Sequence, residues 1–210
     1  AALADPSLIT RLAQRYGINV IHDTALTIDP VAKTVALKGG GKLPYDRLVL
    51  APGIAFKFGT VEGYDQAATE IMPHAWNAGP QTELLRRKLE SMEDGGVFLI
   101  VSPPNPFRCP PGPYERASLV AYYFKQFKPK SKILILDAKD SFFEQDLFQD
   151  AWVRHYPGMI EWLPGQFTGG VKSVNVKDLS VKTEAETFKA AVVNFIPPQT
   201  AAELAQRTGL

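Results

Sequence analysis

One short stretch of this chain, residues 103–115, constrains the fold more than any other. It carries six prolines within eleven residues, together with Cys109, the single cysteine of the 210-residue sequence. The apolar run Val97–Ser102 precedes it and is typical of a buried parallel strand. Apolar residues recur at helical spacing over 114–127, and Lys132–Asp137 then repeats the pattern of a buried strand. Strand, loop, helix and a strand ending in an acid follow the order of a dinucleotide-binding βαβ unit.

The loop of this unit is unsuited to a dinucleotide. A pyrophosphate site needs glycines and backbone N–H donors, whereas proline has no N–H and a fixed φ. The loop instead offers a rigid mount for the Cys109 thiol near the N-terminus of a helix. A helix N-terminus and the neighbouring Arg108 both favour a thiolate. We therefore predict a nucleotide-binding position converted to sulfur chemistry, although a lone cysteine is usually a small buried apolar residue.

The composition excludes several classes of function. The chain has 23 basic and 22 acidic residues and a net charge of +1, which gives no support for nucleic acid or an anionic membrane surface as a partner. It contains no apolar run approaching the roughly 18 residues of a transmembrane helix. No signal peptide is predicted at its start. We expect a protein without a membrane span, without a nucleic-acid partner and without a metal site.

The other predicted elements are those of an α/β protein that contains a β-meander. Strands are expected at residues 18–22, 25–28, 34–37, 48–50 and 190–196, and a helix at residues 79–92. An aromatic stripe follows the second βαβ strand and comprises Phe142, Phe143, Phe148 and Trp152. Such a stripe at helical spacing predicts core packing or an interface rather than a cofactor site.

Four segments resemble, in the same order, the flavoprotein subunit of flavocytochrome c sulfide dehydrogenase, which is related to sulfide:quinone oxidoreductases. The most specific is the cysteine segment at residues 107–117, and the others are residues 45–54, 73–76 and 194–199. The resemblance runs over essentially the whole chain. It implies an α/β, two-dinucleotide-binding-domain flavoprotein (disulfide reductase-like) fold, built from Rossmann-like βαβ units with a β-meander and truncated at both ends.

The same resemblance divides the chain into three parts. Residues 1–78 are expected to be a partial FAD-binding domain that lacks its first strand and Gly-rich loop. Residues 79–198 are expected to be a pseudo-NAD(P)H-binding domain that carries the redox cysteine. Residues 199–210 then begin the return to the FAD domain.

The resemblance implies a flavin-dependent oxidation of sulfide. In the family, sulfide attacks an active-site disulfide on one face of FAD and forms a persulfide, and two electrons pass to the flavin. They leave one at a time to a cytochrome c subunit that carries haem c. Cys109 matches one half of that disulfide, while a second cysteine is absent from these 210 residues. The family is periplasmic, so the same location is expected for this protein.

Glu115 matches an acid that related enzymes place near the cysteine, where it could shuttle protons. An acid in the first turn of a helix also complements the helix dipole, which is an equally good interpretation of Glu115. For FAD, Thr24-Ala25 resembles the place where the family backbone meets the adenine. Ala51-Pro52-Gly53 resembles the return turn beside the diphosphate.

Two alternatives remain open at this point. An NAD(P)H-dependent flavin reductase would use Asp137 to bind the ribose, although the prolines of the loop argue against it. A non-catalytic assembly module would instead use the aromatic surface of residues 142–162 to hold a cytochrome partner.

Overall fold

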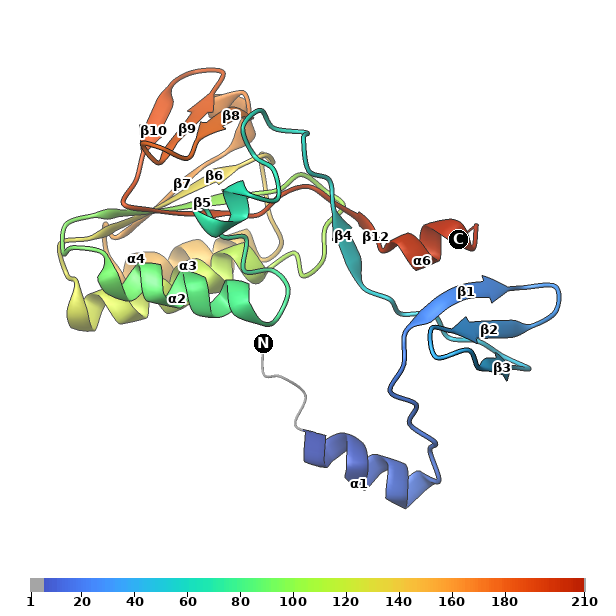
Figure 1. Cartoon of the computed structure of the whole chain (residues 1–210). Coiled ribbons are helices and arrows are strands. Elements are labelled where there is room, and N and C mark those ends of the chain that lie inside the picture. The colour runs from blue at the N-terminus through green and yellow to red at the C-terminus, as the bar shows by residue number, and fades with distance from the viewer. Residues whose placement is uncertain (1–5, 210) are drawn as a thin grey trace. The chain divides into compact units, whose positions relative to one another are not determined.

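The computed structural model describes residues 6–209, which form two compact units (Figure 1). Unit 1 comprises residues 6–55 and 201–209, and unit 2 comprises residues 56–200. Strands β4 (Ile54–Phe56) and β12 (Gln199–Ala201) pair with each other, and the boundary between the units falls inside both strands.

Unit 1 contains a three-stranded β-meander, of which the strands at residues 25–28 and 34–37 were predicted and the third, at residues 42–44, was not. Helix α1 (Pro6–Tyr16) precedes β1 (Ala25–Asp29), β2 (Thr34–Leu37) and β3 (Lys42–Pro44), and α6 (Glu203–Arg207) completes the unit. The three strands are antiparallel in the order β1-β2-β3. The turn after β1 is closed by the Asp29 carboxylate, which accepts hydrogen bonds from the N–H groups of Val31 and Ala32. Such a turn is typical of aspartate because its side chain reaches the backbone two or three residues on.

Two predicted strands of unit 1 are wrong. Residues 18–22 and residues 48–50 form neither helix nor strand. Ile18 is 52% exposed and Val49 is 91% exposed, so neither segment is the buried strand that its apolar pattern predicted. A strand needs a neighbour that accepts and donates its backbone hydrogen bonds, and the described residues provide none for these two segments.

Unit 2 is built on a four-stranded parallel sheet with the strand order β11-β5-β6-β7. These strands are Val192–Phe195, Val97–Ser102, Lys132–Asp137 and Ile160–Leu163, respectively. The predicted buried strands at 97–102 and 132–137 are therefore confirmed, with Val97 opposite Lys132 and Ser102 opposite Asp137. Parallel pairing places the carboxyl ends of β5, β6 and β11 at the same edge of the sheet.

Both faces of this sheet are covered (Figure 1). Helices α2 (Pro80–Ser91), α3 (Gly112–Phe127) and α4 (Gln145–His155) lie on one face. The antiparallel strands β8 (Val171–Asn175), β9 (Ser180–Thr183) and β10 (Thr187–Lys189) lie on the other. The short helices η1 (Ala68–Glu70) and α5 (Gly165–Thr168) occupy connections. No helix within residues 6–209 combines the length and apolar character needed to cross a bilayer.

The residues of β5 alternate between these two layers, which explains why the strand is apolar throughout. Phe98 is fully buried and meets Phe124 of α3 edge to face, with ring centroids 6.5 Å apart. Leu99 and Val101 belong to a buried cluster with Val181 of β9. Burying a side chain of this size stabilises the fold by about 1.5–3 kcal/mol. The sheet is thus a rigid base for the loops at its carboxyl edge.

Candidate active site

The cysteine loop, residues 103–111, leads from the carboxyl end of β5 to the first turn of α3. Cys109 is exposed and unpaired, which contradicts the alternative of a buried apolar cysteine. Its φ of +61° lies in the left-handed region, which is uncommon for a residue with a side chain. Its carbonyl accepts a hydrogen bond from Gly112 N at 2.9 Å, so the residue is fixed to the start of the helix. Residues held in such conformations cluster at functional sites.

Gly112 allows this close approach. A Cβ atom at Gly112 would lie 2.6 Å from Cη2 of Trp76 and 3.2 Å from Sγ of Cys109. The indole ring, the helix backbone and the sulfur therefore pack together without room for a side chain. Helix α3 begins at Gly112, two residues before the predicted start, because Pro113 fits the first turn of a helix.

Three other parts of unit 2 hold the cysteine loop. Arg108 N donates to Oε1 of Gln199 at 2.9 Å, and Nε1 of Trp76 donates to Arg108 O at 3.1 Å. Nζ of Lys139 donates to Pro103 O at 2.9 Å and lies 4.9 Å from the centroid of the Phe107 ring. The loop is therefore anchored on both sides of its phenylalanine, and its cysteine is held by its neighbours rather than left mobile.

Gln199 carries an unsatisfied donor beside this loop. The residue is 4% exposed, and its Nε2 atom has no hydrogen-bond partner among the described residues. Rotating the amide by half a turn would point the NH2 group at Arg108 N, which is itself a donor, so the orientation of the side chain is fixed. An unsatisfied buried donor costs about 1–3 kcal/mol. Its presence indicates an acceptor from a bound group.

Arg116 organises the segment at residues 73–76, which passes beside the start of α3. Its guanidinium donates to His74 O at 3.1 Å, Ala75 O at 2.6 Å and Oδ1 of Asn194 at 2.8 Å. It also lies over the Trp76 ring, 5.0 Å from the centroid. Asn194 is fully buried on β11, and its amide donates to Pro73 O and His74 O. Two of the segments that carry the family resemblance are thus joined by direct hydrogen bonds.

Burial changes the ionisation of two residues here. It lowers the pKa of His74 to about 4, and the nearby Arg116 guanidinium acts in the same direction. His74 is therefore neutral at neutral pH, with Nδ1 accepting a hydrogen bond from Trp76 N at 3.0 Å. Burial also lowers the pKa of Arg116 to about 10, which still leaves it positively charged at neutral pH.

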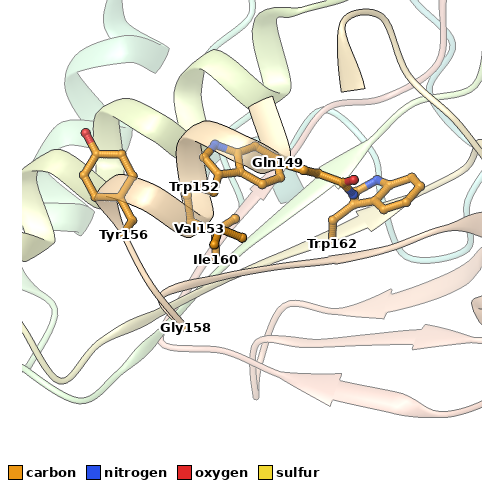
Figure 2. A pocket seen from close by; sticks show the side chains of 7 residues that line it. All are labelled: Gln149, Trp152, Val153, Tyr156, Gly158, Ile160 and Trp162. Carbon is orange, nitrogen blue, oxygen red and sulfur yellow. The ribbon is translucent and has the colours of Figure 1, made fainter. Parts of the chain in front are cut away.

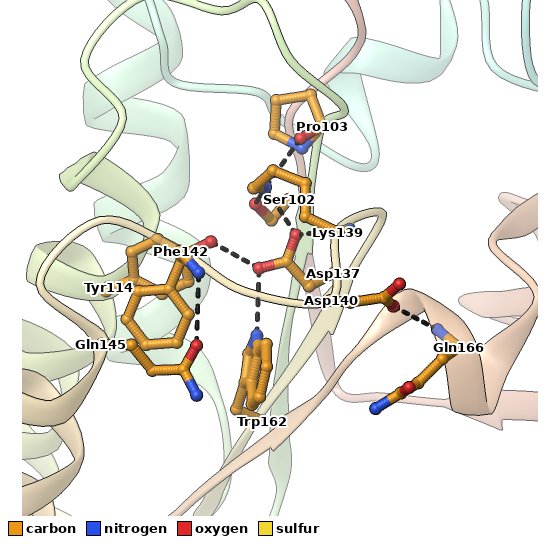
Figure 3. A network of polar contacts seen from close by, with 10 residues as sticks. All are labelled: Ser102, Pro103, Tyr114, Asp137, Lys139, Asp140, Phe142, Gln145, Trp162 and Gln166. Carbon is orange, nitrogen blue, oxygen red and sulfur yellow. Dashed lines mark hydrogen bonds and ion pairs between the residues drawn. The ribbon is translucent and has the colours of Figure 1, made fainter.

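Both oxygens of the carboxylate at the end of β6 are hydrogen-bonded to other side chains of unit 2 (Figure 3). Asp137 is 1% exposed. Its Oδ2 accepts hydrogen bonds from the Tyr114 hydroxyl and from Nε1 of Trp162, the latter at 3.0 Å. Its Oδ1 accepts from Nζ of Lys139 at 2.5 Å, and that ammonium also donates to Oγ of Ser102. Burial and then the Asp137 charge raise the pKa of Tyr114, so its hydroxyl remains a donor. Both oxygens that a ribose would need are already occupied.

The predicted aromatic stripe packs mainly as core. Phe142 stacks on Tyr114 with ring centroids 3.6 Å apart, and it also contacts Phe148 and Trp152. Beside it, α4 and β7 form a cavity of about 290 Å³ (Figure 2). The lining comprises Gln149, Trp152, Val153, Tyr156, Gly158, Ile160 and Trp162. None of these residues belongs to the cysteine loop.

The predicted site residues fall into two groups. Cys109 and Glu115 lie at the start of α3 in unit 2, and the Glu115 side chain is exposed there. Thr24, Ala25, Ala51, Pro52 and Gly53 all lie in unit 1. Their roles remain predictions. The sequence reasoning did not identify Arg116 or Gln199 as site residues, nor the contacts made by His74 and Asn194.

One backbone feature of unit 1 fits a flavin nucleotide as the bound group. Gly53 has a φ of +83°, and a Cβ atom there would meet nothing within 4 Å, so the backbone is open to close approach. Ala51, Pro52 and Gly53 as backbone contacts to FAD, with Thr24 and Ala25 beside the adenine, stay predictions.

Comparison with known proteins agrees with this arrangement. A family model described as the central part of the flavoprotein chain of sulfide dehydrogenase [flavocytochrome c] matches residues 82–197. The sulfide-quinone reductase of Aquifex aeolicus (strain VF5) is 31% identical over 115 residues, which are 55% of this chain and 25% of that protein. The matching stretch therefore spans about a quarter of the length of this relative.

Solved structures show the same fold. The sulfide:quinone oxidoreductase of Aquifex aeolicus aligns with a TM-score of 0.74 at 22% identity, covering 96% of this chain and 47% of that chain. An FAD-dependent pyridine nucleotide-disulphide oxidoreductase from Desulfovibrio vulgaris aligns with a TM-score of 0.55 at 17% identity, covering 100% and 54%. These similarities confirm the predicted fold of a two-dinucleotide-binding-domain flavoprotein.

The match to the family model covers more than half of the chain and includes the whole cysteine loop. It confirms the resemblance that the sequence segments indicated, and with it FAD as the cofactor of the family. The protein belongs to the family of sulfide dehydrogenase [flavocytochrome c] flavoprotein chains, and its residues 82–197 correspond to their central part.

Proposed function

We propose that this chain is part of a sulfide dehydrogenase flavoprotein that oxidises sulfide through Cys109 and FAD and passes electrons to a cytochrome c subunit. The observation that carries the proposal is the mounting of Cys109. An exposed thiol sits in left-handed backbone three residues before α3, in the loop where a dinucleotide-binding unit has glycines. Such a loop presents sulfur where that unit would otherwise bind a pyrophosphate.

In this proposal Cys109 is one half of a disulfide whose other cysteine lies outside these 210 residues. Hydrosulfide forms a bond to one sulfur of the disulfide, the sulfur–sulfur bond breaks, and the other sulfur leaves as a thiolate. Bound FAD would supply the acceptor for the two electrons that sulfide gives up, and haem c on the partner would receive them singly. This chain's own part is to fix the sulfur through the contacts of Trp76, Lys139 and Gln199 with the loop.

Glu115 would take the proton that hydrosulfide loses. Its carboxylate is exposed in the first turn of α3, so it can exchange that proton with water. The same position stabilises a carboxylate through the helix dipole, so the two interpretations of Glu115 are compatible.

The nicotinamide alternative has less support. Its ribose would need Asp137, whose carboxylate is buried and bonded to Tyr114, Trp162 and Lys139. Removing these bonds to bind a ribose would leave buried donors unsatisfied. We infer that the second domain of this protein does not bind NAD(P)H.

We further propose the domain assignment that follows from the family. Residues 1–78 would contribute to the FAD-binding domain, residues 79–198 would form the pseudo-NAD(P)H-binding domain, and residues 199–210 would return to the first. The protein would act in the periplasm, where the family works with its cytochrome subunit.

The test is sulfide-dependent reduction of cytochrome c by the full-length protein with its cytochrome subunit, before and after Cys109→Ser. The variant is expected to bind FAD as the wild type does, seen in the flavin absorbance, and to lose the reduction of cytochrome c. Undiminished reduction in the variant would refute the role of Cys109.

The electron acceptor needs a separate assay, because a relative that is 31% identical over 115 residues is a sulfide-quinone reductase. Parallel assays with cytochrome c and with a short-chain quinone distinguish the two acceptors. Reduction of the quinone alone would overturn the cytochrome part of the proposal and leave sulfide oxidation standing. A protein without flavin that still co-purifies with a haem protein would favour the assembly module.

A further inference from the structure

Arg116 is a mostly buried cation that has no carboxylate partner. Its three hydrogen-bond acceptors are two backbone carbonyls and an amide oxygen, all of them neutral. None of the ion pairs among residues 6–209 includes it. Removing a charge from water without a counter-ion is costly, and neutral dipoles offset only part of that cost. The structure therefore calls for an anion near this guanidinium.

Cys109 is the candidate for that anion. The guanidinium is stacked on the Trp76 ring, and the Cη2 and Cζ2 atoms of that ring pack against Gly112. The sulfur of Cys109 packs against the same glycine. Burial lowers the pKa of Arg116, and a negative charge on Cys109 raises it, so the two groups are within electrostatic range of each other.

The other charged groups around the loop do not fill this role. Arg108 and Glu115 are exposed, so water screens their charges. His74 is buried and neutral at neutral pH. Lys139, which lies over the Phe107 ring, is already paired with Asp137. Arg116 is thus the mostly buried, unpaired positive charge beside the sulfur.

We propose that Arg116 is a positioning residue whose guanidinium is the counter-ion of the Cys109 thiolate once the disulfide is open. From the sequence alone, Arg108, the neighbour of Cys109 in the chain, was expected to favour the thiolate together with the helix N-terminus. The inference rests on the proposed function only in taking Cys109 to be the reactive sulfur. The positive charge of Arg116 stabilises the thiolate, and the negative charge of the thiolate in turn offsets the unpaired charge of Arg116.

The experiment measures the reactivity of the thiol directly. The full-length protein is reduced and then alkylated with iodoacetamide across a range of pH, and the extent of reaction of the Cys109 peptide is read by mass spectrometry. The rate follows the thiolate fraction, so its midpoint in pH reports the stability of the thiolate. Arg116→Met is expected to move the midpoint up by about one pH unit or more, the effect of removing a nearby opposite charge.

Matched variants separate charge from packing. Arg116→Lys keeps the cation but not the planar donor set, so its midpoint is expected between those of the wild type and Arg116→Met. Arg108→Met and Arg108→Lys are the controls, since they alter the exposed cation next to Cys109, and they are expected to leave the midpoint unchanged. Circular dichroism checks that each variant is folded. If Arg116→Met does not fold, the midpoints of Arg116→Lys and Arg108→Lys are compared instead.

The proposal is overturned if the Arg116 variants leave the midpoint unchanged, or if the Arg108 variants move it as far. Neither sulfide nor cytochrome enters this assay. A failure here is therefore distinguishable from a failure of the proposed function, which the Cys109→Ser assay tests.

Discussion

The buried His74, which packs near the cysteine loop, makes the free energy of unfolding depend on pH. Burial lowers its pKa in the folded protein to about 4, whereas an unperturbed histidine has a pKa near about 6.5. Between these values the unfolded chain binds the proton more readily than the folded chain does. The contribution of neutral His74 to the free energy of unfolding is therefore complete above the pKa of histidine in the unfolded chain, and it is lost as the pH falls towards 4. A shift of this size corresponds to about 3 kcal/mol at most.

The prediction is that His74→Asn flattens this part of the stability profile. Asparagine keeps an acceptor for Trp76 N but does not titrate, so the free energy of unfolding should fall less between pH 6.5 and pH 4 than in the wild type. Urea denaturation at several pH values measures it. His155→Asn is the control, because His155 is exposed at the end of α4, and a slope that changed equally in both variants would contradict the prediction.

At the residue scale the sequence singles out Cys109 as a candidate, because the loop that carries it is a local feature, but it does not show which residues hold this loop. Its supports are distant in the chain: Arg108 and Gln199 are separated by 91 residues, and Asn194 and Pro73 by 121. Hydrogen bonds over such separations depend on the tertiary fold, so no spacing in the sequence reveals them. The sequence pointed to Arg108 as the cation that favours the thiolate and gave no sign of Arg116, because adjacency in the chain does not show which side chain is buried.

Among the elements, the carboxyl ends of β5 and β6 and the start of α3 meet at Asp137. The carboxylate accepts hydrogen bonds from Tyr114 of α3, and its partner Lys139 reaches Ser102 at the end of β5. Trp162 adds β7 to the same group. The buried Asp137 carboxylate thus connects three parallel strands to α3, the helix that follows the cysteine loop.

Lys139→Met is expected to be strongly destabilising, because it leaves the Asp137 carboxylate buried without its cation. Breaking a buried ion pair in this way costs about 3–5 kcal/mol. The control is Lys172→Met, which removes an exposed cation 3.3 Å from Glu184. Its expected cost is about 0–1 kcal/mol. Chemical denaturation of the two variants measures the difference, and similar losses in both would show that Asp137 is not dependent on Lys139.

The elements that the sequence predicted well are those with two buried faces or a turn that aspartate or glycine closes. Strands β5, β6 and β11 and the β1-β2 hairpin belong to this group, whereas β3 was not predicted. The failures at residues 18–22 and 48–50 have a common cause. An apolar run predicts burial, but it does not say whether a neighbouring strand is present to pair with it.

The two units of the whole molecule differ sharply in burial. None of the described side chains at residues 9–55 and 201–209 is buried. Unit 2 contains all the fully buried apolar residues, including Phe98, Ile100 and Phe124. Local stability follows the number of buried apolar contacts, so the two units should open with very different free energies.

Hydrogen exchange followed by mass spectrometry of this 210-residue chain tests that difference. Amides of β5, β6 and β11 are expected to exchange slowly, near the limit set by global unfolding. Amides of β1, β2 and β3 are expected to exchange much faster, because their hydrogen bonds are open to water. Equal protection in the two units would contradict the prediction and would indicate that unit 1 is stabilised by contacts other than the burial of its own side chains.

The left-handed backbone at position 109 would suit glycine better than cysteine, so the cysteine is not there for the stability of the fold. A residue with a side chain pays about 1–2 kcal/mol in that conformation, which glycine adopts freely. Glycine in turn loses about 0.5–1 kcal/mol more chain entropy on folding. The strain is the larger of the two effects, so a chain with glycine at this position is expected to fold at least as well and would lack only the thiol. Selection for folding alone therefore does not retain a cysteine at position 109, and a screen for folded variants would also pass chains without the thiol.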